Sequence, residues 1–255
     1  MGKWSRLLTT SQKLQPARGD RSPLLFSPNR ATVEASAISS DTANTDIHLR
    51  RKEKGQYCRI WKRLIDVVVA SVGLLVLSPL LIITGVLIRC TSRGPVLYWQ
   101  DRVGRAGRHF RIAKFRSMIV DADKIGPEIT SSGDARVTSF GARLRKTKVD
   151  EIPQLWNVLK GEMSLVGPRP ELPRYVADYT LEQQRVLCVC PGITDLASIR
   201  YRHEEAVLAQ SGNPEEFYRN VVLPHKLDLN LDYIEKMSFL FDTKLILQTI
   251  KSLFV

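Results

Sequence analysis

The sequence has few cysteines and few acidic residues for its length. Four cysteines are scattered among 255 residues: Cys58, Cys90, Cys188 and Cys190. So few thiols exclude a secreted scaffold stapled by disulfides. Cys188 and Cys190 are separated by a single residue, whereas a zinc knuckle places two or more residues between its thiols. We therefore expect packed thiols in a reducing compartment and no structural zinc.

Basic residues clearly outnumber acidic ones. Lys and Arg total 38 against 26 Asp and Glu, which gives a formal net charge of +12 and a pI near 9.7. This balance favours anionic partners, namely nucleic acid, an anionic membrane surface or phosphorylated substrates. The sequence lacks helix-turn-helix, zinc-finger and aromatic-platform signatures, so we predict no nucleic-acid partner.

The N-terminal part lacks a sustained apolar pattern. Residues 1–56 are rich in Ser, Thr, Ala, Asn, Pro and Arg, which predicts a disordered polar and basic tail. No apolar run of about 7 to 15 residues lies near Met1, so no cleavable signal peptide is expected. We predict that a membrane helix with its basic flank follows at residues 57–93, and a compact domain at residues 94–255.

One long stretch lacks charge altogether. Val67–Ile88 is a run of 22 residues without a charged side chain. At about 1.5 Å per residue this run makes a helix about 33 Å long, which is enough to cross a hydrocarbon core of about 30 Å. The simplest prediction from length alone is a spanning helix.

Two features favour a different path for this helix. Ser78 and Pro79 lie in its middle, and proline removes a helical hydrogen bond and bends the helix. Both flanks are basic, with seven basic residues over 50–63 and six over 89–111. Since Lys and Arg beside membrane segments stay in the cytoplasm, both ends should lie on one side. We therefore favour a re-entrant helix broken at Ser78 and Pro79, with the spanning helix as the alternative.

The central stretch, residues 143–170, begins with a basic run and then an acidic pair. Asp150 and Glu151 follow that run, and Pro153 suits the first turn of a helix. We predict Asp150 as the N-cap of a short helix that ends at Gly161. Its predicted buried face contains Leu155, Trp156, Val158 and Leu159.

The second half of this stretch adds a stiff turn. Gly167–Pro170 fixes Arg169 between two prolines and cannot extend a helix. A carboxylate pair with Arg145, Lys148 and Arg169 around it suits a site for a phosphorylated substrate and a divalent cation. The plainer alternative is a well-capped amphipathic helix without a site.

Two strands with a basic turn between them are predicted earlier in the chain. Val96–Gln100 and His109–Met118 have the composition of strands, joined by a basic turn with two glycines. Lys114 and Arg116 lie in the second strand and are candidates for binding phosphate. The alternative is a strand with a solvated basic face. At the far end of the chain, Pro224–Met237 and Asp242–Val255 show helical periods, and the second packs into the core or lies on the membrane.

Asp121-Ala-Asp123 is a separate acidic motif. It follows an apolar run, as does the metal-binding Asp-x-Asp of ordinary nucleotide-sugar glycosyltransferases. The same residues also suit the start of a helix, where acids face the positive end of the dipole. Both interpretations stay open.

Together, the Lys-Phe-Arg-Ser-Met motif at 114–118, the Asp-Glu pair and the Gly-Pro-Arg-Pro turn closely resemble the bacterial sugar transferase family. Its members are monotopic phosphoglycosyl transferases, which move a sugar phosphate from a nucleotide sugar onto a polyprenyl phosphate. The resemblance runs from about Lys62 to the C-terminus and implies a re-entrant anchor. This chain has Asp195, Ala197 and Ser198 where many members carry glycine and a Trp-Gln pair, which puts the identity of the sugar in doubt.

The resemblance also implies roles for individual residues. Asp150 matches the nucleophile that forms a phosphosugar–enzyme intermediate, and Glu151 its partner, which orients a magnesium ion or accepts a proton from the acceptor phosphate. Asp150 and Glu151 are thus the expected Mg²⁺ ligands. Arg145 and Arg169 match positions that hold phosphate groups, and Lys114 is a third candidate.

We therefore predict a helix-rich α/β fold with few short strands. It would be a monotopic protein of the bacterial inner membrane, with a re-entrant helix–break–helix anchor and a catalytic domain facing the cytoplasm. Its substrates would be a UDP-sugar and a polyprenyl phosphate, which the resemblance implies to be undecaprenyl phosphate, and UMP would leave. Anionic membrane lipids, downstream glycosyltransferases and a second copy of the chain are further expected partners. The alternatives are a metal-dependent glycosyltransferase that uses Asp121 and Asp123, and a membrane-anchored scaffold without activity.

Overall fold

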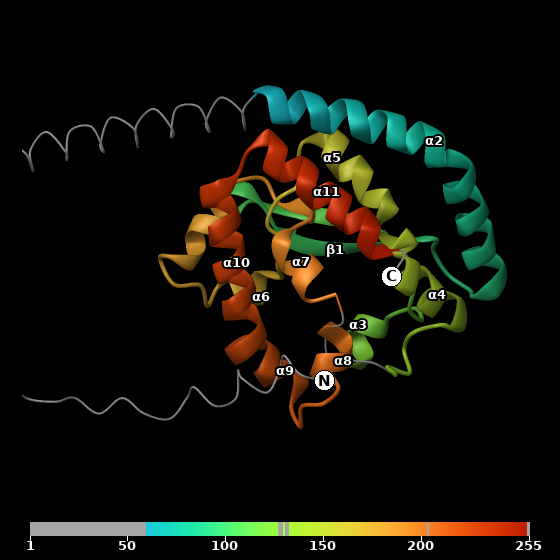
Figure 1. Ribbon diagram of the computed structural model, residues 1–255. Coiled ribbons are helices and arrows are strands. Elements are labelled where there is room, and N and C mark those ends of the chain that lie inside the picture. The colour runs from blue at the N-terminus through green and yellow to red at the C-terminus, as the bar shows by residue number, and fades with distance from the viewer. Residues whose placement is uncertain (1–59, 127–129, 131–132, 203, 254–255) are drawn as a thin grey trace, which may run out of the picture. The chain divides into compact units, whose positions relative to one another are not determined.

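The computed structural model describes residues 60–126, 130, 133–202 and 204–253. The predicted N-terminal tail and Cys58 lie outside the described residues. The described part is helix-rich with few short strands, as the sequence predicts. The strands form two small sheets of two strands each. Figure 1 shows a long curved helix, α2 (Lys62–Thr91), that follows the outside of the other elements.

The helix α2 is long and apolar enough to cross a membrane, which suits the chain to membrane association. Pro79 lies inside it, yet the helix continues from Lys62 to Thr91 and curves instead of breaking. The reason lies in the neighbouring side chain. Pro79 leaves the carbonyl of Leu75 without its helical donor, and the hydroxyl of Ser78 donates to that carbonyl over 2.7 Å. The predicted break is therefore a bend.

One stripe of α2 faces the domain and the rest is exposed. Lys62, Asp66 and Ala70 are buried at one end, and Thr84 and Ile88 at the other. Ile88 packs in a cluster with buried side chains of the second hairpin strand and of α4. Both ends of the helix therefore contact the same domain. Apolar side chains cover the outer surface, among them Val68, Val72, Leu75, Val76, Ile82, Ile83 and Val86.

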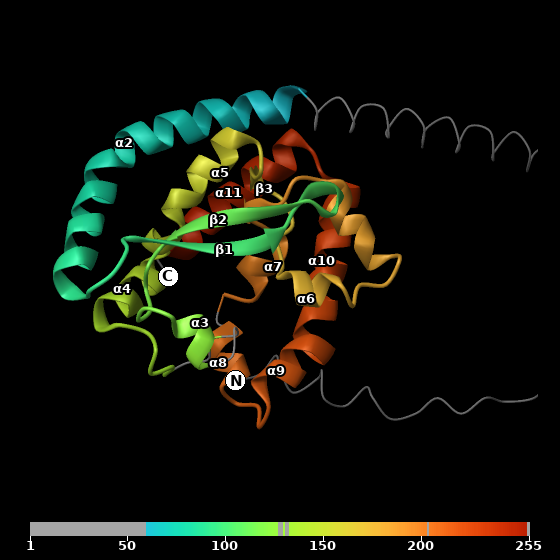
Figure 2. The ribbon, with the colours of Figure 1, turned by 180° about the vertical axis from the view of Figure 1, so that it is seen from behind.

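The first sheet consists of the two predicted strands, which pair as a hairpin. Strands β1 (Leu97–Val103) and β2 (His109–Phe115) pair in antiparallel register, with Leu97 opposite Phe115 and Val103 opposite His109. The turn between them holds a 3₁₀ turn, η2 (Arg105–Gly107). Seen from behind in Figure 2, the hairpin lies below α2 and α5 in the view and passes in front of α11.

The second sheet is parallel and very short. Strands β3 (Ser164–Val166) and β4 (Gly192–Thr194) lie side by side. A Cβ atom on Gly192 would lie 2.1 Å from the backbone nitrogen of Gly167, so only glycine allows this approach. The close contact fixes where the turn after β3 begins.

Short helices connect these sheets to the C-terminal pair, α10 (Leu223–Lys236) and α11 (Phe239–Leu253). Both C-terminal helices confirm the predicted periods within a few residues. On α11 Leu245 is buried, whereas Leu247 and Ile250 are exposed, so the helix packs with only part of its apolar surface. The remaining elements are α3 (Ala122–Ile125), α4 (Ser139–Thr147), η3 (Val149–Gln154), α5 (Leu155–Lys160), α6 (Pro173–Val176), η4 (Gln183–Cys188), α7 (Leu196–Arg200), α8 (Glu204–Leu208), α9 (Pro214–Phe217) and η5 (Tyr218–Val222).

Candidate active site

The acidic pair lies in a tight helical turn, not at a helix cap. Lys148 ends α4 in the left-handed conformation, with φ of 58°, and the chain then enters the 3₁₀ helix η3. Asp150 and Glu151 lie inside η3, and both side chains are buried. The prediction of Asp150 as an N-cap is therefore wrong, because the chain has already turned at Lys148.

The helix after the pair matches the prediction better. It is α5, it follows η3 directly, and it ends at Gly161 in the left-handed conformation. Val158 is fully buried, as expected, but Trp156 is about half exposed. Asn157, whose burial the sequence did not suggest, is also fully buried. Its side chain accepts a hydrogen bond from the amide of Ala113 over 3.0 Å and donates to the carbonyl of Arg111 over 2.8 Å.

Glu151 is held by two cations. Lys114 lies next to the segment of β2 that Asn157 fixes, and its Nζ is 3.2 Å from Oε1 of Glu151. Arg169 contacts both carboxylate oxygens, with Nη1 at 3.3 Å from Oε2 and a closer contact from Nη2 to Oε1. Such a two-pronged ion pair fixes the orientation of the carboxylate and also balances its charge. Three segments that are distant in sequence thus meet at one carboxylate.

These contacts and the burial of the site shift the pKa values of Glu151, Lys114 and Arg169. Burial raises the pKa of Glu151, but the charges of Arg169 and Lys114 outweigh it, and the pKa lies well below its ordinary value. Burial lowers the pKa of Lys114 to about 8 in spite of the carboxylate beside it. The charge of Glu151 raises the pKa of Arg169, which therefore stays protonated.

Asp150 is in the opposite situation to its neighbour. Burial raises its pKa, and the negative charge of Glu151 raises it further. Its Oδ1 atom is buried, and no residue in the described part of the chain donates a hydrogen bond to it. A buried carboxylate oxygen without a hydrogen-bond donor destabilises the fold unless a ligand supplies the missing contact.

The turn that carries Arg169 is fixed from two sides. Its backbone amide lies 3.3 Å from Oδ2 of Asp195, which also caps α7 by accepting from the amide of Ser198 over 2.7 Å. On the other side, Arg102 of β1 donates to the carbonyl of Pro170 over 3.0 Å. The turn is therefore clamped between the hairpin and α7. Asp195 supports the backbone of the turn here.

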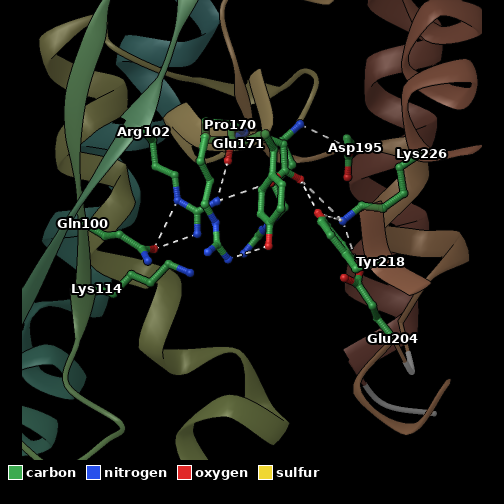
Figure 3. A network of polar contacts seen from close by, with 12 residues as sticks. Gln100, Arg102, Lys114, Pro170, Glu171, Asp195, Glu204, Tyr218 and Lys226 are labelled. Carbon is green, nitrogen blue, oxygen red and sulfur yellow. Dashed lines mark hydrogen bonds and ion pairs between the residues drawn. The ribbon is translucent and has the colours of Figure 1, made fainter. Parts of the chain in front are cut away.

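A buried ionic network lies directly behind this turn (Figure 3). Glu171 is 3.7 Å from both Arg102 and Lys226, and it accepts a hydrogen bond from Tyr218 over 2.7 Å. Lys226, which is itself buried on α10, also donates to Glu204 of α8 over 3.1 Å. Figure 3 shows Arg102 and Lys226 approaching Glu171 from opposite sides. The network ties the hairpin, the turn and the C-terminal helices together.

Sequence reasoning missed most of this network. Glu171 could have been suspected, because it directly follows the Gly-Pro-Arg-Pro turn. Lys226 could not, since a lysine within an amphipathic helix normally lies in solvent. Its contacts with Glu171 and Glu204 arise only because α10 packs across the turn.

Two other phosphate-binding candidates lie apart from Glu151. Arg145 of α4 forms an ion pair with Glu205 of α8. Arg116 is buried at the C-terminal end of α2, where it donates to the carbonyl of Ser92 over 2.9 Å. It lies one residue beyond β2, which ends at Phe115, so the strand no longer sets the direction of its side chain. The structure brings together Lys114, Asp150, Glu151 and Arg169, and does not bring Arg145 or Arg116 into direct contact with Glu151.

The Asp121–Asp123 motif is a surface feature. Both aspartates are exposed, and Asp121 pairs with Lys124 over 3.0 Å on the same short helix, α3. Among the described residues no group of three or more His, Cys, Asp or Glu side chains could hold a metal ion. Asp150 and Glu151 could supply two oxygen ligands, and the unpartnered Oδ1 of Asp150 fits that role. Magnesium is commonly held by one or two carboxylates, with substrate phosphates and water completing its shell.

Comparison with known proteins shows the family of this chain. The model of the family described as bacterial sugar transferase matches residues 57–255. The chain belongs to the bacterial sugar transferase family. The match covers α2, the hairpin, the acidic pair and the Gly-Pro-Arg-Pro turn.

Several curated members of the family are similar to this chain. A UDP-N-acetylgalactosamine-undecaprenyl-phosphate N-acetylgalactosaminephosphotransferase of Aeromonas hydrophila is 35% identical over 75% of this chain and 43% of the relative. An undecaprenyl-phosphate glucose phosphotransferase of Komagataeibacter xylinus is 39% identical over 80% of this chain and 37% of the relative. A UDP-glucose:undecaprenyl-phosphate glucose-1-phosphate transferase of Caulobacter vibrioides is 37% identical over 75% of this chain and 69% of the relative. The chain thus spans less than half the length of the first two.

Proposed function

We propose that this protein is a phosphoglycosyl transferase that moves a sugar phosphate from a UDP-sugar to a polyprenyl phosphate and releases UMP. The observation that carries the proposal is the contrast within the acidic pair. Glu151 accepts hydrogen bonds from Lys114 and Arg169, whereas Asp150 keeps a buried oxygen without a donor from the described residues. The curated relatives act on undecaprenyl phosphate according to their names, which makes that lipid the expected acceptor.

In the first proposed step, a carboxylate oxygen of Asp150 attacks the phosphorus that bears the sugar. An oxygen–phosphorus bond forms at Asp150, the bond from that phosphorus to the bridging oxygen breaks, and UMP leaves with the bridging oxygen. In the second step, a phosphate oxygen of the polyprenyl phosphate attacks the same phosphorus. The bond to Asp150 then breaks, which restores the carboxylate and yields the polyprenyl-diphosphate sugar.

The neighbouring residues have supporting roles in this proposal. Glu151 orients Arg169 and Lys114, which would stabilise the phosphate charge. A carboxylate whose pKa is lowered is a weak base, so accepting a proton is the less suitable of its two expected roles. Asp150 and Glu151 would hold a magnesium ion, whose contribution is to neutralise phosphate charge.

We include a re-entrant membrane anchor in the proposal. It is supported by the bend at Pro79, by the two basic flanks and by the contacts that both ends of α2 make with one domain. A helix docked at both ends on one domain would have to leave that domain to cross a bilayer. The catalytic domain would then lie on the cytoplasmic side of the inner membrane. Nucleotide sugars occur in the cytoplasm, so the donor substrate could reach it there.

The identity of the leaving nucleotide tests the reaction. The purified protein would be incubated with a panel of UDP-sugars, polyprenyl phosphate and magnesium, and the nucleotide product identified by chromatography. Release of UMP is expected, because the sugar-bearing phosphate moves with the sugar. Release of UDP would mean transfer of the sugar alone and would favour the Asp121–Asp123 glycosyltransferase. Release of neither nucleotide from any UDP-sugar would favour the scaffold.

The topology is tested by labelling thiols in cells with a permeabilised outer membrane. Cys58 lies before the uncharged run and Cys90 just after it, and the other thiols can be changed to serine. A membrane-impermeant maleimide is expected to label neither before lysis. Strong labelling of Cys58 in intact cells would show that the helix spans the membrane.

A further inference from the structure

The N-terminal end of α2 carries charged residues that face the domain instead of the membrane. Lys62, Arg63 and Asp66 lie just before or at the edge of the apolar run. From the sequence, Lys62 and Arg63 belong to a basic flank for lipid headgroups. In the structure Lys62 and Asp66 are buried and Arg63 is half-buried. Their polar atoms therefore bind protein groups.

Asp66 binds the strand that leads into the Arg169 turn. Its Oδ1 accepts a hydrogen bond from the amide of Leu165, the middle residue of β3, over 3.0 Å. β3 ends one residue later, and the Gly-Pro-Arg-Pro turn begins immediately after it. A hydrogen bond to a charged acceptor inside the protein is one of the stronger kind. Asp66 is thus joined to Arg169 through four residues of rigid chain.

Arg63 binds the helix that follows the acidic pair. Its guanidinium donates to the carbonyls of Val158 and Leu159, the second over 2.7 Å. These carbonyls lie in the last turn of α5, where helical carbonyls lack their usual donor four residues on and the dipole favours a cation. The carbonyl of Val158 also accepts from the amide of Gly161 over 3.0 Å. Because α5 follows η3 without a break, Arg63 holds the far end of the segment that carries Glu151.

The two contacts converge on one ion pair. Arg169 and Glu151 come from different segments. Asp66 binds the segment that leads to Arg169, and Arg63, one helical turn before Asp66 on α2, binds the segment that follows Glu151. We propose that Asp66 and Arg63 are positioning residues that set the Arg169–Glu151 pair relative to the membrane helix. The phosphate site is then held at a fixed place with respect to the bilayer in which its lipid substrate lies. This inference rests on the proposed transferase activity, so a measurable turnover in the unaltered protein is its starting point.

The test compares three variants in full-length protein within membranes. Asp66→Leu removes the acceptor, Asp66→Asn keeps an oxygen that can accept from Leu165, and Thr84→Val alters another buried polar side chain on the distant half of α2. Membrane insertion and thermal unfolding are measured for each, and rates are expressed per folded molecule. Asp66→Leu is expected to lower kcat about 10- to 100-fold with little change in the KM for UDP-sugar, since small misplacement of a site has such effects. Asp66→Asn should recover most of the loss, and Thr84→Val should match the unaltered protein.

A double-mutant cycle with Arg169→Lys shows whether Asp66 acts through Arg169. If it does, Asp66→Leu will cost much less in the Arg169→Lys background than in the unaltered protein. Fully additive losses, equal impairment of Asp66→Asn and Asp66→Leu, or a normal kcat in folded Asp66→Leu would each overturn the inference. If Asp66→Leu does not fold, Arg63→Lys takes its place in the same cycle, because one ammonium group cannot serve both carbonyls as the guanidinium does. Absence of turnover in the unaltered protein would instead refute the proposed function.

Discussion

Two acidic motifs in this chain begin in nearly the same way and end in opposite environments. Asp121 and Lys148 both adopt the left-handed conformation, with φ of 59° and 58°, and each precedes a short helical turn that carries acids. Asp121 pairs with Lys124 in solvent, whereas Glu151 is buried under Lys114 and Arg169. The difference lies in what other segments bring to each turn. Acids make a candidate site here because β2 and the turn after β3 deliver cations to them.

The largest effect is expected from removing the unpartnered carboxylate. Asp150→Asn keeps the size of the side chain but removes its charge, so it cannot form the phosphosugar intermediate. Turnover should fall by about 10³-fold or more. UMP release per folded molecule measures this, with thermal unfolding as the control for the fold. Near-normal turnover would exclude Asp150 as the nucleophile.

A smaller loss is expected where the two-pronged contact with Glu151 is broken. Arg169→Lys keeps the positive charge but offers a single ammonium group in place of the fork. Turnover should fall about 100-fold, the usual cost of losing one oriented donor to a transition state. Arg185→Lys, at a largely exposed ion pair with Glu182, is a matched control and should change little. Equal effects of the two substitutions would mean that the fork at Glu151 has no special part in the reaction.

A pH dependence is expected from Lys114. Burial lowers its pKa to about 8, so it carries its charge below that pH and loses it as the pH rises through that value. If the charge holds substrate phosphate, kcat/KM should decline above about pH 8. In Lys114→Arg the charge persists, and this decline should move to higher pH or vanish. An unchanged decline would assign it to another group.

The smallest effect is expected at the exposed motif. Asp121→Asn and Asp123→Asn remove surface charges, so turnover should stay within about twofold and the free energy of unfolding within about 0.5 kcal/mol. The same UMP assay and thermal unfolding measure both. A loss comparable to that of Asp150→Asn would reverse the comparison between the two motifs.

Much of the fold follows from local sequence patterns. The uncharged run, the hairpin strands on either side of a glycine-containing turn, and the helix end at Gly161 all depend on neighbours along the chain. Such features can be predicted because hydrophobic period, proline and glycine act over a few residues. The bend at Pro79 belongs here as well, although the hydrogen bond from Ser78 that keeps the helix continuous was not expected.

The sequence by itself determined the family, the apolar helix and the presence of an acidic pair near a fixed arginine. Only the tertiary structure decided that Glu151, and not Asp150, receives Arg169 and Lys114, and that Arg145 and Arg116 pair elsewhere. It also decided that Asp66 and Arg63 bind the domain instead of facing lipid headgroups. The physical reason is that a charge inside a protein takes the partners that packing brings within reach, and those partners lie on segments far away in the chain.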